Sequence, residues 1–419
     1  NMNASTSASA ATATAAASSA AVASGHAVRP VSANDLAIVK AQHWIVKVPL
    51  KNPIVWGSGV RTGVTRAIVR LETAGGVVGW GETICLLDAI PAVLEKIVLP
   101  VALTKTVDQA ESLYRHVLGS GYYHHKRAAV MAICAVEMAM WDAFGKACGQ
   151  PLHRLWGGLW RDKVDIAAYI FSNIPAQVAA DARAFRDRGF GTFKLKIGYD
   201  EPTDISLTRA VREAIGPDAP LRLDVNGAWT PGTARRQCAK LAPFDPAYVE
   251  QPLEMDDLAG HAFLRRSTSV PIALDESAYT LNDVGNIVRM EAADVILLDP
   301  HEEGSLWQCV KAAAIAESVG IPVTLHCGGE LGLSQAAYLH LAASIPNMTL
   351  AIDNELDYLG GNIIVDPFVI EGGALPVPTR PGLGVDVDLA LVERYQVSGI
   401  TGAYLDPRRP GWFPMKPAY

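Results

Sequence analysis

The chain of 419 residues is poor in cysteine and has no excess of basic residues. Its six cysteines are scattered, and none forms a CxxC pair. So few dispersed thiols exclude a disulfide scaffold and favour a reduced, cytoplasmic protein. The 36 Lys and Arg residues stand against 43 Asp and Glu residues, which gives a net charge of −7. Because a nucleic-acid-binding protein usually carries a basic face, we expect no nucleic-acid partner.

Long hydrophobic runs are also missing. The longest apolar run, residues 128–136, ends at Glu137 and is far shorter than the roughly 18 to 20 residues of a membrane span. We therefore expect no membrane partner. Residues 1–34 contain no acidic residue and no lysine, and they are mostly Ala, Ser and Thr. They lack the charged N-terminal region and the apolar central region of a secretory signal peptide, so we predict a disordered, low-complexity tail.

Half of the residues are hydrophobic, which is enough for a large core. Residues 35–157 mix β-branched runs at 36–48 and 65–82, the second broken at 74–76, with a helical pattern at 126–148 that Gly149 would cap. This order predicts an α+β domain. Residues 361–419 are rich in Gly and Pro and are expected to pack back on that domain.

Residues 158–360 have a different rhythm, in which short β-rich runs alternate with amphipathic helical stretches such as 177–188 and 306–319. Alternation of this kind predicts βαβ units and a parallel sheet. Eight units in about 190 residues favour a closed barrel. An open doubly wound sheet is the alternative, but the Gly-rich fingerprint it prefers does not follow the first run. The eight runs are 166–171, 192–197, 221–225, 248–250, 272–275, 295–298, 323–326 and 350–352.

Ionisable and polar side chains recur at the carboxyl ends of these runs, about one βα unit apart. In a parallel barrel such strand ends converge on one mouth, where active sites lie. A charged residue at one strand end is usually a solvated cap, but seven consecutive strand ends are hard to explain in that way. The residues are Lys194, Lys196, Asp224, Asn226, Glu250, Asp275, Glu276, Asp299, His326 and Glu355.

Three neighbouring strand ends supply carboxylates, namely Asp224, Glu250 and either Asp275 or Glu276. Hard oxygen ligands without thiol or imidazole suit Mg²⁺ or Mn²⁺. Such a site leaves room for the oxygen of a small carboxylate substrate. The sequence therefore predicts a metal site here and leaves both residues open as third ligand, with Asp275 favoured by its DES context.

Two groups of residues are candidate acids and bases. Lys194 and Lys196 alternate along one strand and point to the same side, so we expect their repulsion to lower one pKa toward neutrality. Asp299 and His326 end neighbouring strands, where a carboxylate would fix the imidazole tautomer and raise the basicity of its other nitrogen. Lys196 and His326 would then approach a bound substrate from opposite sides.

This arrangement indicates removal of the proton α to a carboxylate through an enediolate intermediate. Glu355 is placed to hydrogen-bond the substrate carboxylate if it stays protonated, and Asn226 and Lys194 are further candidates for substrate binding. Loss of a β-hydroxyl would make the reaction a dehydration, whereas reprotonation on the other face would make it a racemisation or epimerisation. We favour dehydration of a sugar acid or other hydroxy acid.

Together, these motifs resemble those of the mandelate racemase / muconate-lactonising branch of the enolase superfamily. The resemblance covers nearly the whole chain after the tail and rests on AVEMAMWDAFGK, FKLKIG, LDVNGAW, VEQPL, ALDES, VTLHCGG and GGALPVPTRPGLGVDVD. It implies a modified (β/α)7β TIM-like barrel with an N-terminal α+β capping domain, a Mg²⁺ cofactor and a homo-oligomer. The implied substrate-selecting loops of the capping domain are 53–60 and 85–89.

The sequence departs from both halves of this branch. LDES is similar to the muconate-lactonising side, on which a Lys commonly ends the sixth strand, but this chain has Asp299 there. Cycloisomerase and dipeptide-epimerase activities are therefore disfavoured. A non-catalytic barrel is disfavoured because the acid, base and ligand candidates are all intact. A nucleotide-binding loop at 328–332 is a weak alternative because the Lys-Ser/Thr of a P-loop is missing.

Overall fold

The computed structural model describes residues 30–86, 88–400 and 415–419. Its first sheet is antiparallel and contains β1 (Ile38–Trp56), β2 (Gly59–Thr73) and β3 (Val78–Ile84). The predicted break at 74–76 is the turn between β2 and β3. The first hairpin is longer than the sequence indicated, because β1 and β2 stay paired up to Trp56 and Gly59. Residues 53–60 therefore form the tip of a hairpin.

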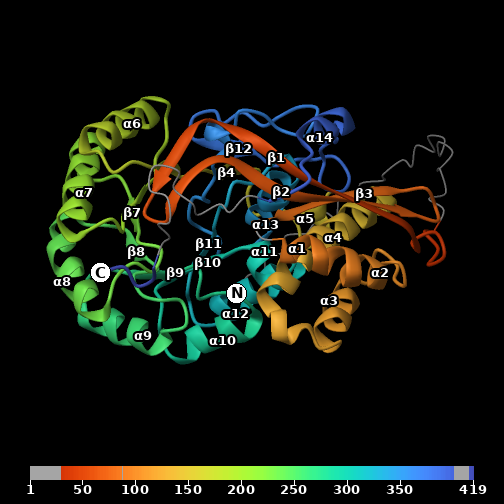
Figure 1. Ribbon diagram of the computed structural model, residues 1–419, viewed down its shortest axis with the longest axis horizontal. Helices are drawn as coiled ribbons and strands as arrows, with labels where there is room; N and C mark the ends of the chain where they lie inside the picture. The colour runs from red at the N-terminus through yellow and green to blue at the C-terminus, as the bar shows by residue number, and fades with distance from the viewer. Residues whose placement is uncertain (1–29, 87, 401–414) are drawn as a thin grey trace, which may run out of the picture. The chain divides into compact units, whose positions relative to one another are not determined.

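The long helix of the first domain packs against this sheet, and most of the shorter helices lie around that helix (Figure 1). The predicted helix at 126–148 is confirmed, and it ends at Gly149 in the left-handed conformation (φ 64°). By length and composition this helix could span a membrane, but 78% of its most apolar stretch is buried inside the protein, as in a core helix. The helices are α1 (Ala89–Val93), η1 (Leu94–Val98), α2 (Leu99–Ala102), α3 (Ala110–Gly119), η2 (Tyr122–His125), α4 (Lys126–Cys148) and α5 (Leu152–Leu155).

Two glycines of β3 let α4 lie directly on the sheet. A Cβ atom on Gly81 would fall 1.8 Å from the carbonyl oxygen of Ala135, and one on Gly79 would fall 2.0 Å from that of Ala139. Real side chains do not approach a backbone oxygen so closely. The alternation VGWGE therefore sets the distance between helix and sheet.

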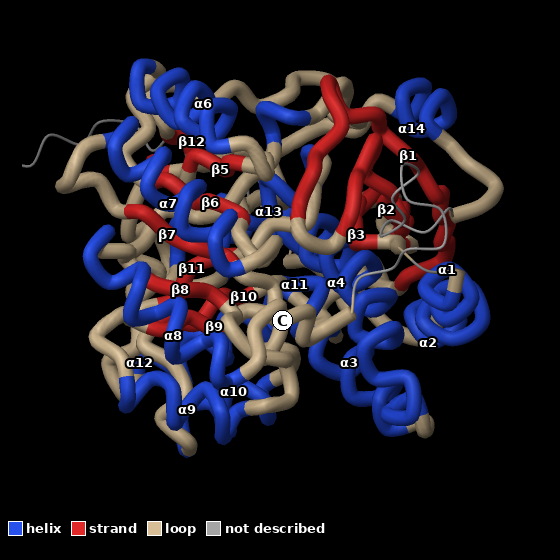
Figure 2. Tube along the Cα trace, turned by 60° about the vertical axis from the view of Figure 1, so that its left-hand side comes forward, coloured by secondary structure: helices blue, strands red, loops and turns tan. Residues whose placement is uncertain are grey.

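The predicted βα units are present as a parallel seven-stranded sheet in the order β11-β10-β9-β8-β7-β6-β5. Figure 2 shows these strands stacked side by side with helices outside them. The strands are β5 (Ala168–Ile170), β6 (Phe193–Lys196), β7 (Leu221–Asp224), β8 (Tyr248–Glu250), β9 (Ile272–Leu274), β10 (Val295–Leu298) and β11 (Val323–Leu325). The helices are α6 (Pro175–Asp187), α7 (Glu201–Ile215), α8 (Pro231–Leu241), η3 (Ala242–Phe244), α9 (Leu258–Ser267), α10 (Leu281–Arg289), α11 (Pro300–Glu303), α12 (Leu306–Glu317) and α13 (Gly332–Ser344).

The eighth predicted run closes the barrel with very few backbone contacts. Ile352 forms an isolated parallel bridge with Ile166, next to β5. On its other side the segment meets β11, where the amide of Asp353 donates to the carbonyl of Leu325 at 3.1 Å. The chain therefore forms the predicted (β/α)7β barrel, and its last strand is reduced to a short bridging segment.

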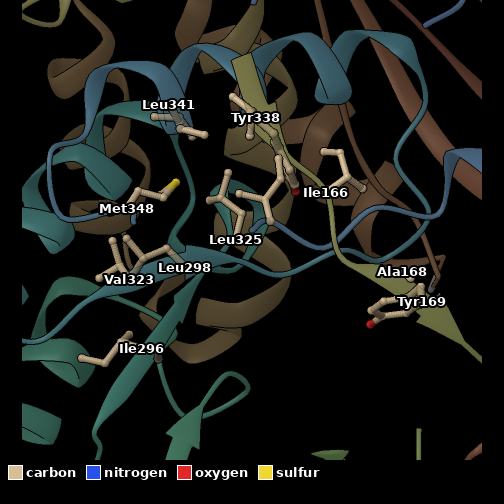
Figure 3. Close-up of a cluster of buried hydrophobic side chains, with 14 of the residues drawn as sticks. Ile166, Ala168, Tyr169, Ile296, Leu298, Val323, Leu325, Tyr338, Leu341 and Met348 are labelled. Carbon is tan, nitrogen blue, oxygen red and sulfur yellow. The ribbon is translucent and has the colours of Figure 1, made fainter. Parts of the chain in front are cut away.

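The barrel core is apolar where the strands face their helices. Figure 3 shows Val323 and Leu325 of β11 close to Leu298 of β10, with Tyr338 of α13 beyond Leu325 and Ile296 of β10 on the side away from Tyr338. All five are buried. This packing anchors the strands, so that the residues following β10 and β11 are held at fixed positions at the mouth of the barrel.

The remaining segments pack at two places. Near the first sheet, the amide of Val397 donates to the carbonyl of Ile45 at 2.8 Å. At the barrel, by contrast, the amide of Ala418 donates to the carbonyl of Ala228 at 2.7 Å. These segments include β4 (Lys163–Asp165), which pairs with β12 (Ala374–Pro376), and also η4 (Leu356–Tyr358) and α14 (Leu389–Tyr395).

Candidate active site

Three strand-end residues form one row across adjacent strands. Lys196 of β6 is in register with Asp224 of β7, which is in register with Glu250 of β8. The Nζ atom of Lys196 donates to Oδ2 of Asp224 at 2.5 Å. Asp275 follows β9, the next strand, and is fully buried. The predicted ligand strands are therefore neighbours, and the lysine lies at the end of the row.

Lys194 lies two residues before Lys196 on β6, deeper inside the barrel than this row. Its Nζ atom contacts carboxylate oxygens of Glu250 at 2.7 Å, Asp353 at 2.5 Å and Asp224 at 3.3 Å, and its side chain is fully buried. Its ammonium group therefore neutralises the acidic row from inside the barrel. Asp353, which also contacts Arg222 at 3.4 Å, was not singled out from the sequence.

The expectation of a lowered lysine pKa is wrong for this arrangement. Burial lowers the pKa of both ammonium groups, but nearby carboxylates outweigh burial and raise it: Asp224 for Lys196, and chiefly Asp353 and Glu250 for Lys194. The sequence showed two cations on one strand, but it did not show how many acids surround them.

Burial and neighbouring charges also shift the pKa values of the acids of the row in different directions. The two lysines outweigh burial and hold the pKa of Asp224 below its usual range. Burial, together with the charge of Asp224, raises the pKa of Glu250 to about 8. Burial also raises the pKa of Asp275 well above its usual value.

Several oxygens of this set are oriented for a further positive charge. Within the described part of the chain, Oε2 of Glu250 and both oxygens of Asp275 are buried without a hydrogen-bond partner. A buried, unpaired carboxylate oxygen is costly unless a proton or a cation satisfies it. An all-oxygen set from three adjacent strands fits a hard divalent ion. Asp224, Glu250 and Asp275 are thus the residues present that fit Mg²⁺.

Asn226 connects the lysine to the second candidate acid after β9. Its side-chain oxygen accepts from Nζ of Lys196 at 3.0 Å, and its side-chain nitrogen donates to Oε1 of Glu276 at 2.9 Å. Glu276 is only partly buried and faces the cavity. Both oxygens of Asp275 therefore lack a hydrogen-bond partner, whereas Glu276 has an amide partner on Oε1 and an unpartnered Oε2.

The predicted Asp299–His326 pair is present, and it is part of a larger network. Oδ2 of Asp299 lies 2.6 Å from Nδ1 of His326. Oδ1 of Asp299 lies 2.7 Å from Nδ1 of His301 and accepts from the hydroxyl of Tyr338 at 2.9 Å. Burial lowers the pKa of His326, but Asp275 and Asp299 outweigh burial and raise it well above its usual value. One buried carboxylate thus orients two imidazoles.

The two candidate acid–base residues face one cavity of about 270 Å³. Lys196 and His326 both line it, whereas Lys194, Asp224, Glu250, Asp275 and Asp299 lie behind its wall. A larger cavity of about 490 Å³ lies beside α6 and includes none of these residues, so its size does not make it the active site. The smaller cavity is lined by Trp56, Arg61, Ile84, Leu86, Arg127, Met131, Tyr169, Lys196, Asn226, Met255, Glu276, Tyr279, His301, Glu302, His326, Cys327, Gly328 and Glu355.

Glu355 lines the cavity but has a cationic partner. Arg61 of β2 donates to its Oε1 atom at 2.7 Å, so this oxygen already has a hydrogen-bond donor from the protein. Arg61 and Trp56, which both belong to the first sheet, thus line the cavity together with the barrel residues. Of the predicted selecting loops, 53–60 contributes Trp56 and 85–89 contributes Leu86, while residue 87 is outside the described residues.

The segment 415–419 borders an adjoining cavity of about 280 Å³. Lys416 lines this cavity, which shares Trp56, Asn226, Met255 and Glu276 with the first. Burial lowers the pKa of Lys416 against the opposing charges of Glu276 and Asp224. Sequence reasoning missed this lysine, because nothing near it signals a return to the barrel mouth.

Two family models cover most of the chain. The model described as "Mandelate racemase / muconate lactonizing enzyme, N-terminal domain" matches residues 39–157, and the model "Enolase C-terminal domain-like" matches residues 177–391. With the fold and the strand-end residues above, these matches place the chain in the enolase superfamily, in its mandelate racemase and muconate-lactonising branch. The chain is accordingly an enzyme, in a superfamily of lyases, racemases and isomerases.

Relatives with different reactions are similar to the chain to nearly the same degree. An N-succinylamino acid racemase of Amycolatopsis is 35% identical, covering 81% of this chain and 92% of its own. A probable glucarate dehydratase of Streptomyces coelicolor is 32% identical, covering 80% and 86%. A solved enolase structure from Mycobacterium smegmatis in complex with tartrate has a TM-score of 0.84 and 28% identity, covering 93% and 100%. Overall similarity therefore does not distinguish racemisation from dehydration in this chain.

Proposed function

We propose that this enzyme dehydrates a sugar acid or another hydroxy acid, with Lys196 as its base and His326 as its acid. The observation that carries the proposal is the shared cavity: Lys196 from β6 and His326 after β11 face one space, and each is held by its own carboxylate, Asp224 or Asp299. A group on each flank of a bound substrate allows one proton to be removed and another to be delivered.

Asp224, Glu250 and Asp275 would hold Mg²⁺. This ion, when bound, supplies positive charge against the negative charge that develops on the substrate carboxylate and against the acids that keep Lys196 protonated. Lys194 stays in contact with Glu250 and orients that carboxylate. Glu276 and Asn226 face the cavity beside Lys196, where they are placed to hydrogen-bond substrate hydroxyls.

For a 2,3-dihydroxy acid, the reaction removes one proton from C2 and delivers one proton to the C3 hydroxyl. Lys196, in its neutral form, takes the α-proton on Nζ, and the C–H electron pair moves into the enediolate form of the substrate. The pair then forms the C2–C3 double bond as the C3–O bond breaks. His326 donates the Nε2 proton to the departing hydroxide, which leaves as water. The enol product tautomerises to a 2-keto acid.

The polar lining of the cavity supports a hydroxylated substrate. Hydrogen-bonding side chains from several elements face it, including Arg61, Asn226, Glu276, Glu302 and Glu355. A racemase that acts only at the α-carbon needs no acid directed at C3 and no hydrogen-bonding groups along the rest of the substrate. The proton held on His326 between Asp299 and Asp275 supports a role as acid in the elimination.

The test is proton NMR in D₂O with Mg²⁺ and a panel of aldonic, aldaric and simple 2-hydroxy acids. We expect a substrate to be lost and a 2-keto acid to form. Lys196→Ala is expected to lose both keto-acid formation and deuterium exchange at the α-carbon. His326→Asn is expected to lose keto-acid formation by a factor of about 10² or more and to retain α-exchange.

Lys240→Ala is the matched control, because that lysine is exposed on α8. Circular dichroism at the assay temperature should show that all three variants are folded. Exchange at the α-carbon without any keto acid in the wild type would make the enzyme a racemase or epimerase. Unchanged turnover in both active-site variants, or turnover that survives exhaustive chelation, would contradict the proposed mechanism.

A further inference from the structure

A second cluster of metal-binding groups lies beside the acidic row. Asp275, Glu302 and His326 each offer one ligand atom, and these atoms lie within 4.8 Å of one another. Nε2 of His326 is 3.6 Å from Oδ2 of Asp275. The three residues come from different elements, since Asp275 follows β9, Glu302 lies in α11 and His326 follows β11.

Unsatisfied atoms point into this cluster. Across the described ranges, both oxygens of Asp275 and Oε2 of Glu302 are buried and accept no hydrogen bond. Asp275 is 0% exposed and Glu302 is 6% exposed. Two buried carboxylates with unpaired oxygens next to an imidazole nitrogen are a costly arrangement unless a cation lies between them.

The other side of His326 is already prepared for such a role. Asp299 lies 2.6 Å from Nδ1, which leaves Nε2, the atom facing Asp275, as the nitrogen on which a metal ion would replace the proton. A carboxylate behind a histidine is the usual outer support of a metal-bound imidazole. Asp299 is itself held by the hydroxyl of Tyr338 and by His301.

The neighbouring trio of Asp299, His301 and His326 is also compact enough for an ion, but it is not a comparable site. Both oxygens of Asp299 are occupied, one by His326 and the other by His301 and Tyr338. That group is a completed hydrogen-bond network. The unpaired oxygens lie on the Asp275 and Glu302 side.

We infer that Asp275, Glu302 and His326 form a second cation site, which takes a transition-metal ion such as Zn²⁺ or Co²⁺ and inhibits the enzyme. One imidazole nitrogen with two carboxylates suits these ions, whereas Asp224, Glu250 and Asp275 form an all-oxygen set suited to Mg²⁺. Asp275 belongs to both sets, and its two oxygens are both available.

The inhibitory effect rests on the proposed function. An ion on Nε2 of His326 occupies the atom that we assign to proton donation, so the elimination stops while the Mg²⁺ ligands Asp224 and Glu250 are untouched. Ion binding itself does not depend on the reaction. The two ideas can therefore fail separately.

The binding test uses Co²⁺ as the probe, titrated into the full-length protein in saturating Mg²⁺, with visible absorption and calorimetry as readouts. We expect one Co²⁺ per chain with d–d absorption bands. Glu302→Gln and His326→Asn should each weaken Co²⁺ binding by about tenfold or more. Glu254→Gln is the matched control, because this acid borders only the adjoining cavity and should leave Co²⁺ binding unchanged.

The turnover test compares rates with and without Zn²⁺ in the same Mg²⁺ buffer. Zn²⁺ should inhibit the wild type, and the ratio of the two rates should return toward one in Glu302→Gln. Equal Co²⁺ affinity in the wild type, Glu302→Gln and His326→Asn would overturn the site, and so would complete displacement of Co²⁺ by Mg²⁺. Absence of any keto acid in Mg²⁺ alone would instead contradict the proposed function and leave the Co²⁺ result standing.

Discussion

Arg61 and Glu355 form an ion pair at 2.7 Å across 294 positions of sequence. Arg61 lies on the first sheet, and Glu355 follows the bridging segment that closes the barrel. The side chains are 12% and 2% exposed, so the pair is shielded from water. The hairpin of the first domain is thereby attached to the wall of the catalytic cavity by one charged contact.

Removing one partner of this pair should destabilise the protein more than removing both. Arg61→Met leaves a buried carboxylate without its cation, and we expect the free energy of unfolding to fall by about 3 kcal/mol. The double variant Arg61→Met/Glu355→Gln should recover part of that loss. Urea denaturation of the four proteins in the cycle measures the coupling. Strict additivity of the two single variants would show that the contact contributes nothing to stability.

Replacing Lys194 should make the protein more dependent on Mg²⁺. Lys194→Met removes the ammonium that contacts Glu250, Asp353 and Asp224, so three buried carboxylates lose their common cation. We expect a lower melting temperature in chelator and a larger rise on adding Mg²⁺ than in the wild type, since a ligand stabilises the state that binds it. Differential scanning fluorimetry with and without Mg²⁺ checks this, with Lys240→Met as control. An equal or smaller Mg²⁺ response would contradict the shared-charge explanation.

The contact of α4 with β3 should tolerate no side chain at Gly81. Gly81→Ala places Cβ against the carbonyl oxygen of Ala135, so helix and sheet must separate. We expect a loss of about 3 kcal/mol in the free energy of unfolding, at the upper end for overpacking. Gly119→Ala at the end of α3 is the control, because its Cβ meets no described atom within 4 Å and it should be neutral or slightly stabilising. Similar denaturation midpoints for the two variants would refute the close approach.

Acid should destabilise the protein partly through His261. Burial lowers the pKa of this imidazole to about 4, and its Nε2 accepts from the amide of Leu253 at 3.2 Å. The unfolded chain binds the proton near pH 6.5 and the folded chain does not, so stability is complete above about pH 6.5 and is lost as the pH falls toward 4. The full effect is about 3 kcal/mol.

The check is the free energy of unfolding of wild type and His261→Gln between pH 7.5 and 5. The variant cannot take up this proton, so its stability should fall less steeply, by up to about 1.4 kcal/mol per pH unit. Parallel pH profiles for the two proteins would show that His261 does not contribute.

The barrel was predictable because its signals are local. The strands from β6 to β11 are short β-rich runs that end in an ionisable residue or are directly followed by one, and the row Lys196, Asp224 and Glu250 follows from one residue position per strand. The helix at 126–148 was predictable from its apolar period and from Gly149. These features depend on neighbours in sequence, which a single chain records.

The missed residues depend on contacts between distant segments. Arg61 and Lys416 reach the cavities from a hairpin and from the segment 415–419, and neither has a local pattern that marks it. The pKa of Lys194 was misjudged because Asp353 comes from the bridging segment, 159 positions away in the sequence. His301 and Glu302 were detectable in principle, because they lie just after Asp299 and Pro300, where residues 299–303 hold four ionisable residues in five positions.

The bridging segment at Ile352 is a seam in an otherwise continuous ring of strands. The groups it positions, Asp353 and Glu355, hold the buried lysine and the arginine from the first domain. A shift of this segment would move Asp353 and Glu355 together. It would therefore displace the partner of Lys194 inside the barrel and the partner of Arg61 at the cavity in one step.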